Sequence, residues 1–353
     1  MSNPHHAHEP LDARPPHASE EPRAVEVVAT PVKLIKPPAL PPNATIAILS
    51  PASTPRPELV ERGIAHLQSL GYKTLLGEHA LDRGPLYYAG TREDRLADLH
   101  AAFANPAVDA ILCTRGGWGS AELLPYLDLD LIRANPKPFL GYSDHTSLHL
   151  WLRDHIGLVT FYAPMCAADF ARDNGVDPAS WTHALSGSAN WTLTANDGLR
   201  ILRAGNGPAE GRLEGGCLSI YAESLGTPYA PQPASAEPRI LFLEDIGVKP
   251  YQWDRLLLHL RYAGLLDNVT GIIFGDMRQC VPADDEPLLE RALLHALADF
   301  RGPIAIGLRS GHVDASNITL PLGIRARLDL STAKPRLDFL ESAVTPPTET
   351  ATL

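Results

Sequence analysis

The chain has 353 residues, 44% of them hydrophobic, which is enough for a sizeable core, and its length favours two domains. Thirty basic against 41 acidic residues give a net charge of −11. This charge argues against nucleic acid or an anionic membrane surface as the main partner, because both attract clustered lysine and arginine. No apolar run reaches the roughly 18 residues of a membrane helix, and no secretory signal pattern opens the chain. Four scattered cysteines without a C-x-x-C pair predict a reducing compartment, the cytoplasm.

Residues 1–43 are rich in proline and histidine and lack helical or strand periodicity, which predicts a disordered tail or a loosely attached arm. His5, His6 and His8 offer ligands for a metal, but a solvated polar tail is the interpretation we favour. Val25–Val28 and Val32–Ile35 are the stretches that we expect to order, as an arm on the body.

Short apolar stretches alternate with amphipathic ones over residues 44–168. The predicted strands are 45–50, 72–76, 107–113 and 138–142, and the predicted helices are 57–70, 91–104, 120–127 and 146–155. Thr91 is the expected N-cap of its helix, and Gly157 follows the end of the last one. This alternation predicts an α/β domain with a mostly parallel sheet covered by helices on both faces.

The second half of the chain has a different texture. Residues 169–210 are polar and weakly periodic, which predicts a passage between domains. Within residues 211–340 we expect strands at 239–243 and 271–274, a helix at 254–263 and antiparallel strands within Ala315–Leu330. The C-terminal domain is therefore predicted to be β-rich and α+β, followed by a frayed tail over residues 341–353.

The segment Gly141-Tyr142-Ser143-Asp144 stands between a predicted strand and a predicted helix. A serine on such a turn exposes its hydroxyl beside the amides of the helix N-terminus, which suits a nucleophile. The usual elbow is G-x-S-x-G, whereas the fifth position here is His145. The alternative is that Ser143 or Asp144 simply caps the helix.

A glycine-rich segment, Arg115-Gly116-Gly117-Trp118-Gly119, also follows a buried strand. Glycines there let backbone amides face a ligand, which favours a phosphate loop, one half of an oxyanion hole, or only a tight turn. The segment fits neither G-x-G-x-x-G nor a P-loop, so the glycines alone do not decide.

Two further segments supply an acid and a base. The apolar strand before Glu244-Asp245 ends in two carboxylates, which either orient a histidine or enter solvent. His312 lies in a loop, and a histidine pKa near about 6.5 suits general-base work. His145 and His149 are spaced for one helix face, but no H-E-x-x-H accompanies them, so we predict no metal site.

The chain resembles the LD-carboxypeptidases, serine peptidases that include murein tetrapeptide carboxypeptidases and microcin C immunity peptidases. Six ordered blocks between Ala44 and Leu330 carry the resemblance: Ala89-Gly90-Thr91 with Arg95, Asp98 and Leu99; Thr114-Arg115-Gly116-Gly117-Trp118-Gly119; Gly141-Tyr142-Ser143-Asp144; Leu213-Glu214-Gly215-Gly216; Leu243-Glu244-Asp245; and Gly311-His312 with Asn317, Leu320, Pro321 and Gly323. The resemblance implies a Rossmann-like N-terminal domain, a smaller β-rich C-terminal domain and a site between them.

The resemblance also implies roles for residues. Ser143 matches the nucleophile, Glu244 the triad acid and His312 the base, while the amides of Asp144 and of Gly116 or Gly117 match the oxyanion hole. It implies a homodimer that needs no metal or cofactor and removes the terminal D-alanine from the murein tetrapeptide in peptidoglycan recycling. A microcin-type amidase acting on peptidyl-nucleotides and a non-catalytic muropeptide-binding module are the alternatives.

Three residues are candidates for substrate contacts. Arg115 either meets the substrate carboxylate or forms a structural salt bridge, and Trp118 either walls the cleft or packs in the core. At the block near residue 215 the family has Gly-Gly-Asn-Leu, whereas this chain has Gly216-Cys217-Leu218. Cys217 is therefore either a changed substrate contact or a small buried apolar residue.

Overall fold

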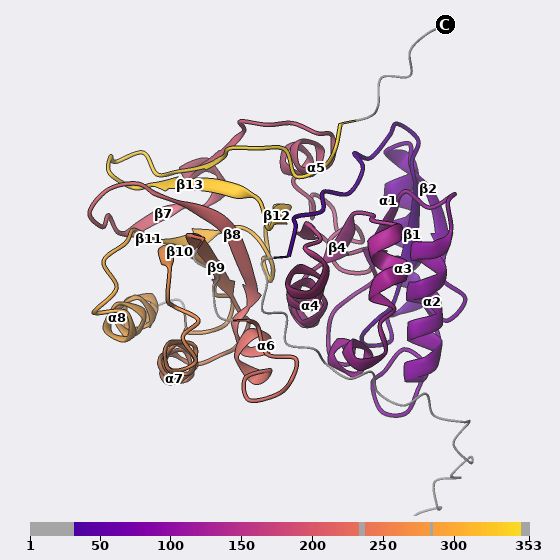
Figure 1. The fold of residues 1–353 in the computed structure, drawn as a ribbon, viewed down its shortest axis with the longest axis horizontal. Coiled ribbons are helices and arrows are strands. Elements are labelled where there is room, and N and C mark those ends of the chain that lie inside the picture. The colour runs from indigo at the N-terminus through magenta and orange to yellow at the C-terminus, as the bar shows by residue number, and fades with distance from the viewer. Residues whose placement is uncertain (1–31, 233–236, 283–284, 347–353) are drawn as a thin grey trace, which may run out of the picture.

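The computed structural model describes residues 32–232, 237–282 and 285–346. Two sheets lie side by side, each flanked by helices (Figure 1). The predicted tail residues 1–31, with His5, His6, His8 and Val25–Val28, lie outside the described residues, as do residues 347–353. Within the described part, no helix is long and apolar enough to cross a membrane.

The N-terminal sheet has the strand order β12-β5-β4-β3-β1-β2 in the described residues. Its first five strands in chain order run parallel to one another: β1 (Thr45–Leu49), β2 (Lys73–Leu76), β3 (Ala110–Cys113), β4 (Phe139–Gly141) and β5 (Thr160–Tyr162). Its helices are α1 (Pro57–Ser69), α2 (Arg92–Ala104), α3 (Leu129–Ala134), α4 (Thr146–Ile156) and the 3₁₀ helices Ser120–Tyr126 and Ser143–His145. The predicted Rossmann-like α/β domain is confirmed.

Local sequence signals explain the limits of these elements. The four residues of β3 are all buried, as expected for a parallel strand covered on both faces. Thr91 and Asp94 form a reciprocal capping box that starts α2. Gly157 ends α4 at φ 72°, and a Cβ on it would stand 2.2 Å from the Lys33 carbonyl oxygen. Only glycine fits this helix end.

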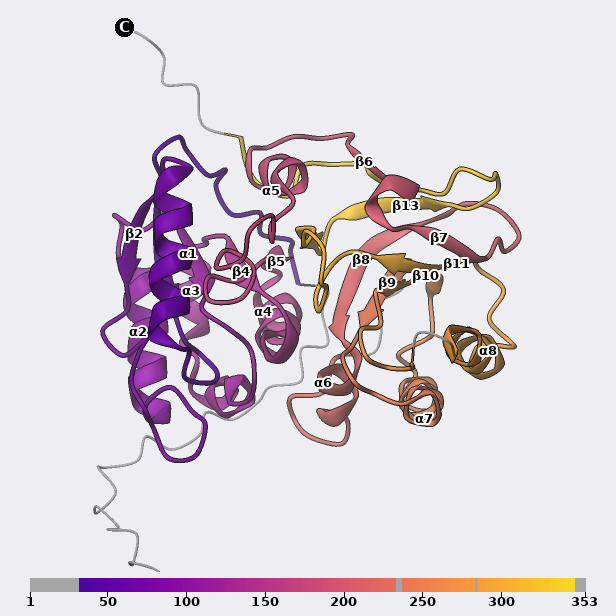
Figure 2. The same cartoon turned by 180° about the vertical axis from the view of Figure 1, so that it is seen from behind.

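The C-terminal sheet has the order β6-β14-β13-β8-β9-β10-β11-β7. Its strands are β6 (Thr192–Thr194), β7 (Arg200–Arg203), β8 (Ala209–Cys217), β9 (Arg239–Glu244), β10 (Val269–Gly275), β11 (Ile304–Leu308), β13 (Arg325–Asp329) and β14 (Arg336–Phe339). The β8-β9-β10-β11 core is parallel and the outer pairs are antiparallel. Helices α6 (Leu218–Glu223), α7 (Pro250–Tyr262) and α8 (Glu286–Ala296) lie along one side (Figure 2). The domain is sheet-rich, as predicted, with a mixed sheet.

Three segments link the two halves in ways that local patterns did not predict. Strand β12 (Leu320–Leu322), within the predicted antiparallel run Ala315–Leu330, pairs with β5 and completes the N-terminal sheet. The predicted passage 169–210 contains α5 (Pro178–Leu185), β6 and β7. The Ile35 amide donates to the Gly157 carbonyl (2.8 Å), and the Thr345 amide donates to the Pro37 carbonyl (2.8 Å). These bonds hold the described parts of both predicted tails against the body.

Candidate active site

Ser143 lies at the corner where β4 ends and the 3₁₀ helix Ser143–His145 begins. Its φ of 66° is in the left-handed region, which a non-glycine residue rarely adopts. The Ser143 amide donates to the Tyr162 hydroxyl (3.1 Å), which helps to hold this conformation. The corner therefore has the sharp strand-to-helix geometry of an exposed nucleophile rather than that of an ordinary helix cap.

His145 occupies the position of the usual second glycine and contacts the backbone of the corner. The His145 ring is fully buried, and its Nδ1 bonds the Tyr142 carbonyl (3.0 Å). His149 Nε2 bonds the Gly141 carbonyl (2.9 Å) in the same way. Burial lowers the pKa of His145 to about 3 and that of His149 to about 4, so both rings are neutral. Both rings form hydrogen bonds with backbone carbonyls of the corner. Among the described residues, neither histidine belongs to a cluster of three or more potential metal ligands.

Glu244 and His312 form a buried hydrogen-bonded pair. His312 Nδ1 lies 2.9 Å from Glu244 Oε2, and the His312 amide donates to the same oxygen (3.0 Å). Burial by itself raises the pKa of Glu244, but the charge and hydrogen bonds of His312 outweigh this effect and hold it below its ordinary value. Burial by itself lowers the pKa of His312, but the Glu244 carboxylate outweighs it and raises this pKa above 6.5. The pair is thus an ionised carboxylate that orients an imidazole.

Small residues make room for this pair. Gly311 has φ 93°, and a Cβ on it would stand 2.5 Å from Glu244 Cδ. Gly275 approaches the other side, where a Cβ would stand 2.5 Å from Glu244 Cβ. The Asn317 side chain donates to the Gly311 carbonyl and accepts from the Gly311 amide, both at 3.0 Å. The loop that carries His312 is therefore fixed from both sides.

The glycine-rich segment closes against the serine corner. A Cβ on Gly116 would stand 2.8 Å from Ser143 Cβ and 3.5 Å from the Asp144 amide nitrogen. Gly117 has φ 112°, and a Cβ there would meet Ser53 Oγ at 2.3 Å. The Asp144 carboxylate points away from the corner and accepts from the Ser120 amide (2.8 Å). The backbone of this segment is brought next to Ser143, as an oxyanion hole requires.

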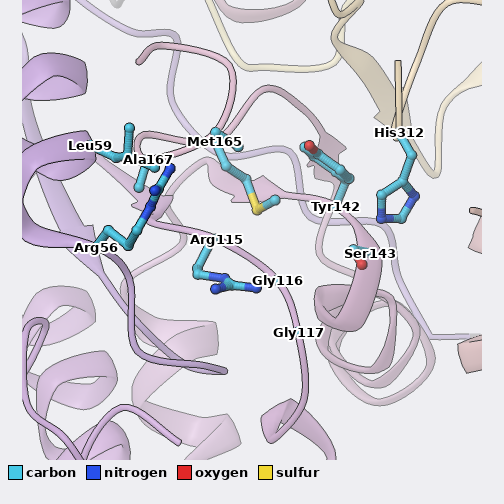
Figure 3. Close-up of a pocket in the computed structure, with 11 residues that line it drawn as sticks. Arg56, Leu59, Arg115, Gly116, Gly117, Tyr142, Ser143, Met165, Ala167 and His312 are labelled. Carbon is cyan, nitrogen blue, oxygen red and sulfur yellow. The ribbon is translucent and has the colours of Figure 1, made fainter. Parts of the chain in front are cut away.

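A cavity of about 300 Å³ opens in front of this arrangement (Figure 3). Ser143 and His312 lie at one end of it, and Arg56 and Arg115 lie toward the other. Its lining residues are Arg56, Leu59, Arg115, Gly116, Gly117, Tyr142, Ser143, Met165, Ala167, Ala168 and His312. No acidic residue is among them, although the whole chain has a net charge of −11. The cavity therefore suits an anionic group held toward the end away from the serine.

The other predicted contact residues differ in their positions. Arg115 also lines an adjoining cavity of about 690 Å³, and no ion pair involving it is found among the described residues. Trp118 is 49% exposed and lines the same adjoining cavity, so it is a wall residue and not part of the core. Cys217 is 3% exposed and lines neither cavity; its Sγ lies 3.5 Å from Ser219 Oγ. The structure favours a buried apolar residue there over a substrate contact.

Two residues at the site were not identified from the sequence. Arg56 follows the loop after β1, and only the fold shows that this loop meets the one after β3. Tyr162 ends β5 within an ordinary buried apolar run, and its hydroxyl donates to Glu244 Oε1 (2.5 Å). Residues at or after the carboxyl ends of parallel strands lie at one edge of the sheet, and this general rule could have indicated both Arg56 and Tyr162.

A strained serine corner beside a histidine–carboxylate pair resembles the arrangement found in serine hydrolases. Comparison with known proteins identifies the family of the chain. Residues 46–163 match the LD-carboxypeptidase N-terminal domain, and residues 210–328 match the LD-carboxypeptidase C-terminal domain. The chain belongs to the LD-carboxypeptidase family, whose members include murein peptide carboxypeptidases and microcin immunity proteins.

Three relatives illustrate the range of this family. A probable murein peptide carboxypeptidase of Bacillus subtilis is 36% identical over 83% of this chain and 91% of its own. The murein tetrapeptide carboxypeptidase of Pseudomonas aeruginosa is 31% identical over 81% of this chain and 94% of its own. A structure of MccF in complex with glutamyl sulfamoyl guanosine superposes with a TM-score of 0.78 at 27% identity, covering 88% of this chain and 99% of that one.

Proposed function

We propose that this protein is a serine LD-carboxypeptidase that removes the terminal D-alanine from murein tetrapeptides in peptidoglycan recycling. The observation that carries the proposal is the cavity with Ser143 and His312 at one end and two arginines, without an acid, at the other. An exopeptidase must recognise a free terminal carboxylate close to the bond that it cleaves. A guanidinium binds a carboxylate through two parallel hydrogen bonds, so Arg115 and Arg56 suit this role.

The chemistry is acyl transfer in two steps. His312 takes the proton of the Ser143 hydroxyl as the serine oxygen attacks the scissile carbonyl, and Glu244 keeps the Nδ1 proton in place and stabilises the imidazolium. D-alanine leaves after His312 returns that proton to its nitrogen. Water, activated by the same histidine, then hydrolyses the ester on Ser143 and releases the shortened peptide.

The oxyanion of each step forms beside the serine corner. The amides of Asp144 and of Gly116 or Gly117 are the donors in this proposal, since the Ser143 amide is already bonded to Tyr162. Each such donor is worth about 2.7–4 kcal/mol in the transition state. The side chains of Ser143 and His312 share no hydrogen bond in the described structure, and we expect that bond to form when substrate fills the cavity.

Mass spectrometry of murein tetrapeptide tests the proposal. Wild type is expected to remove one alanine, and Ser143→Ala is expected to remove none. The likeness to MccF favours one second candidate, an amidase that cleaves peptidyl-nucleotides. Folded wild type that spares the tetrapeptide but cleaves an aminoacyl sulfamoyl adenosine would replace the first proposal by the second. The proposal includes a cytoplasmic homodimer, which light scattering and cell fractionation check.

A further inference from the structure

Tyr162 joins the nucleophile corner to the acid of the other sheet. It ends β5 of the N-terminal sheet and is fully buried, whereas Glu244 ends β9 of the C-terminal sheet. The Tyr162 hydroxyl donates to Glu244 Oε1 (2.5 Å) and accepts from the Ser143 amide (3.1 Å). One oxygen atom thus touches groups that are 101 positions apart in the chain (244 − 143).

The direction of both bonds follows from the chemistry of the groups. An ionised carboxylate only accepts and a backbone amide only donates, so the single phenolic proton lies on the Glu244 side. Glu244 therefore receives hydrogen bonds from both halves of the molecule: Tyr162 from one, and the amide and Nδ1 of His312 from the other.

The space for Tyr162 is built by its neighbours. Gly216 has φ 143°, and a Cβ there would stand 3.2 Å from Tyr162 Cε2 and 2.6 Å from Thr146 Oγ1. The rings of Phe242 and Tyr142 pack against Tyr162 at centroid distances of 5.6 and 6.0 Å. The ring has little room to move, so the hydroxyl stands at a fixed position between the two groups it bonds.

We propose that Tyr162 is a positioning residue that holds the Ser143 corner and the Glu244 carboxylate in one geometry and shares the negative charge that Glu244 presents to His312. This inference rests on the proposed serine chemistry. It assigns to the N-terminal domain a direct part in tuning the base that the C-terminal domain supplies.

Tyr162→Phe tests the inference because it keeps the ring and removes only the hydroxyl. The readout is the rate at which a fluorophosphonate modifies Ser143 as a function of pH, which requires no murein substrate. We expect a rate lower by about 10- to 100-fold, the effect of losing one hydrogen bond to a charged group. The acid limb should move to higher pH, because Glu244 then interacts more strongly with His312. The charges of Asp245 and Asp169 also raise the pKa of His312, the Tyr142 ring packs against it, and none of these residues is changed.

Tyr221→Phe is the matched control. Tyr221 is also fully buried, but no hydrogen-bond partner of its hydroxyl is found among the described residues. This variant should label at the wild-type rate with the wild-type pH profile. A Tyr162→Phe protein that behaves in the same way overturns the inference.

A second substitution decides the question if Tyr162→Phe does not fold. Replacement of Tyr162 by 3-fluorotyrosine keeps both hydrogen bonds and makes the hydroxyl a stronger donor. The acid limb should then move to lower pH, and an unmoved limb overturns the inference. If wild type labels at Ser143 yet leaves the tetrapeptide intact, the proposed substrate is wrong, and the labelling profiles still decide the role of Tyr162.

Discussion

Replacement of Gly311 by alanine should destabilise the protein in two ways, through backbone strain and through loss of the hydrogen bonds between Glu244 and His312. A control glycine separates the two effects. The new Cβ would stand 2.5 Å from Glu244 Cδ, whereas an ordinary contact begins at 3.4 Å, so the carboxylate must retreat by 0.9 Å (3.4 − 2.5). In the wild-type structure the His312 amide nitrogen and Nδ1 lie 3.0 and 2.9 Å from Glu244 Oε2. A retreat of that size takes both past the 3.5 Å limit of a hydrogen bond.

The magnitude follows from these contacts. A left-handed alanine costs roughly 1–2 kcal/mol. Hydrogen bonds to a buried charged group contribute about 1.5–3 kcal/mol each, of which relaxation recovers a part. Gly226→Ala is the control, because Gly226 has φ 83° with nothing within 4 Å of its would-be Cβ. We expect Gly311→Ala to be less stable than Gly226→Ala by about 2–4 kcal/mol.

Urea unfolding and tetrapeptide turnover together measure both costs. Gly226→Ala should keep wild-type turnover, whereas Gly311→Ala should lose about 10³- to 10⁴-fold, as when a triad acid is lost. Equal stabilities of the two variants, with wild-type turnover in Gly311→Ala, would refute the idea that Gly311 exists to admit Glu244.

Three further predictions concern the reaction itself. Ser143→Ala and His312→Ala should each lower turnover by a factor on the order of 10⁶, with little further loss in the double variant; independent, additive effects would contradict a shared mechanism. Burial lowers the pKa of His312, but Glu244 raises it more, so this pKa lies above 6.5. His312 must be neutral to accept a proton, so kcat/KM should decrease as the pH is lowered, with its acid limb above pH 6.5. An acid limb below pH 6.5 would count against the Glu244–His312 pair. Arg115→Gln and Arg56→Gln should raise KM for the tetrapeptide by about 10-fold or more while fluorophosphonate labelling is unchanged; an unaltered KM in both variants would remove the carboxylate role.

Local patterns were sufficient for much of the fold. The predicted strands and helices of the N-terminal half lie close to their predicted limits, because buried runs and caps such as the Thr91–Asp94 box are local signals. The short elements α3 and β5 were not predicted. The pairing of β12 with β5 could not be predicted in this way. Alternation tells which residues of a strand are buried but not which edge the strand joins.

The site residues also differ in whether local sequence patterns indicate them. Ser143, Glu244 and His312 could be named from motifs, because each follows a recognisable turn or strand end. Tyr162 could not, since a tyrosine that ends an apolar strand is usually only a core residue, and its partners come from distant segments. For Cys217 a departure from a family motif left two alternatives, a changed substrate contact or a buried apolar residue, and the burial of its side chain favours the second.

The pairing of β12 with β5 has a consequence for the order in which the protein is made. The edge of the N-terminal sheet stays open on the ribosome until residues 320–322 emerge, long after β5 itself has been synthesised. The His312 loop emerges only a few residues earlier. Closing the first sheet and delivering the histidine are therefore nearly one event, so a nascent chain whose N-terminal sheet is still open at this edge has only just received, or still lacks, its active-site histidine.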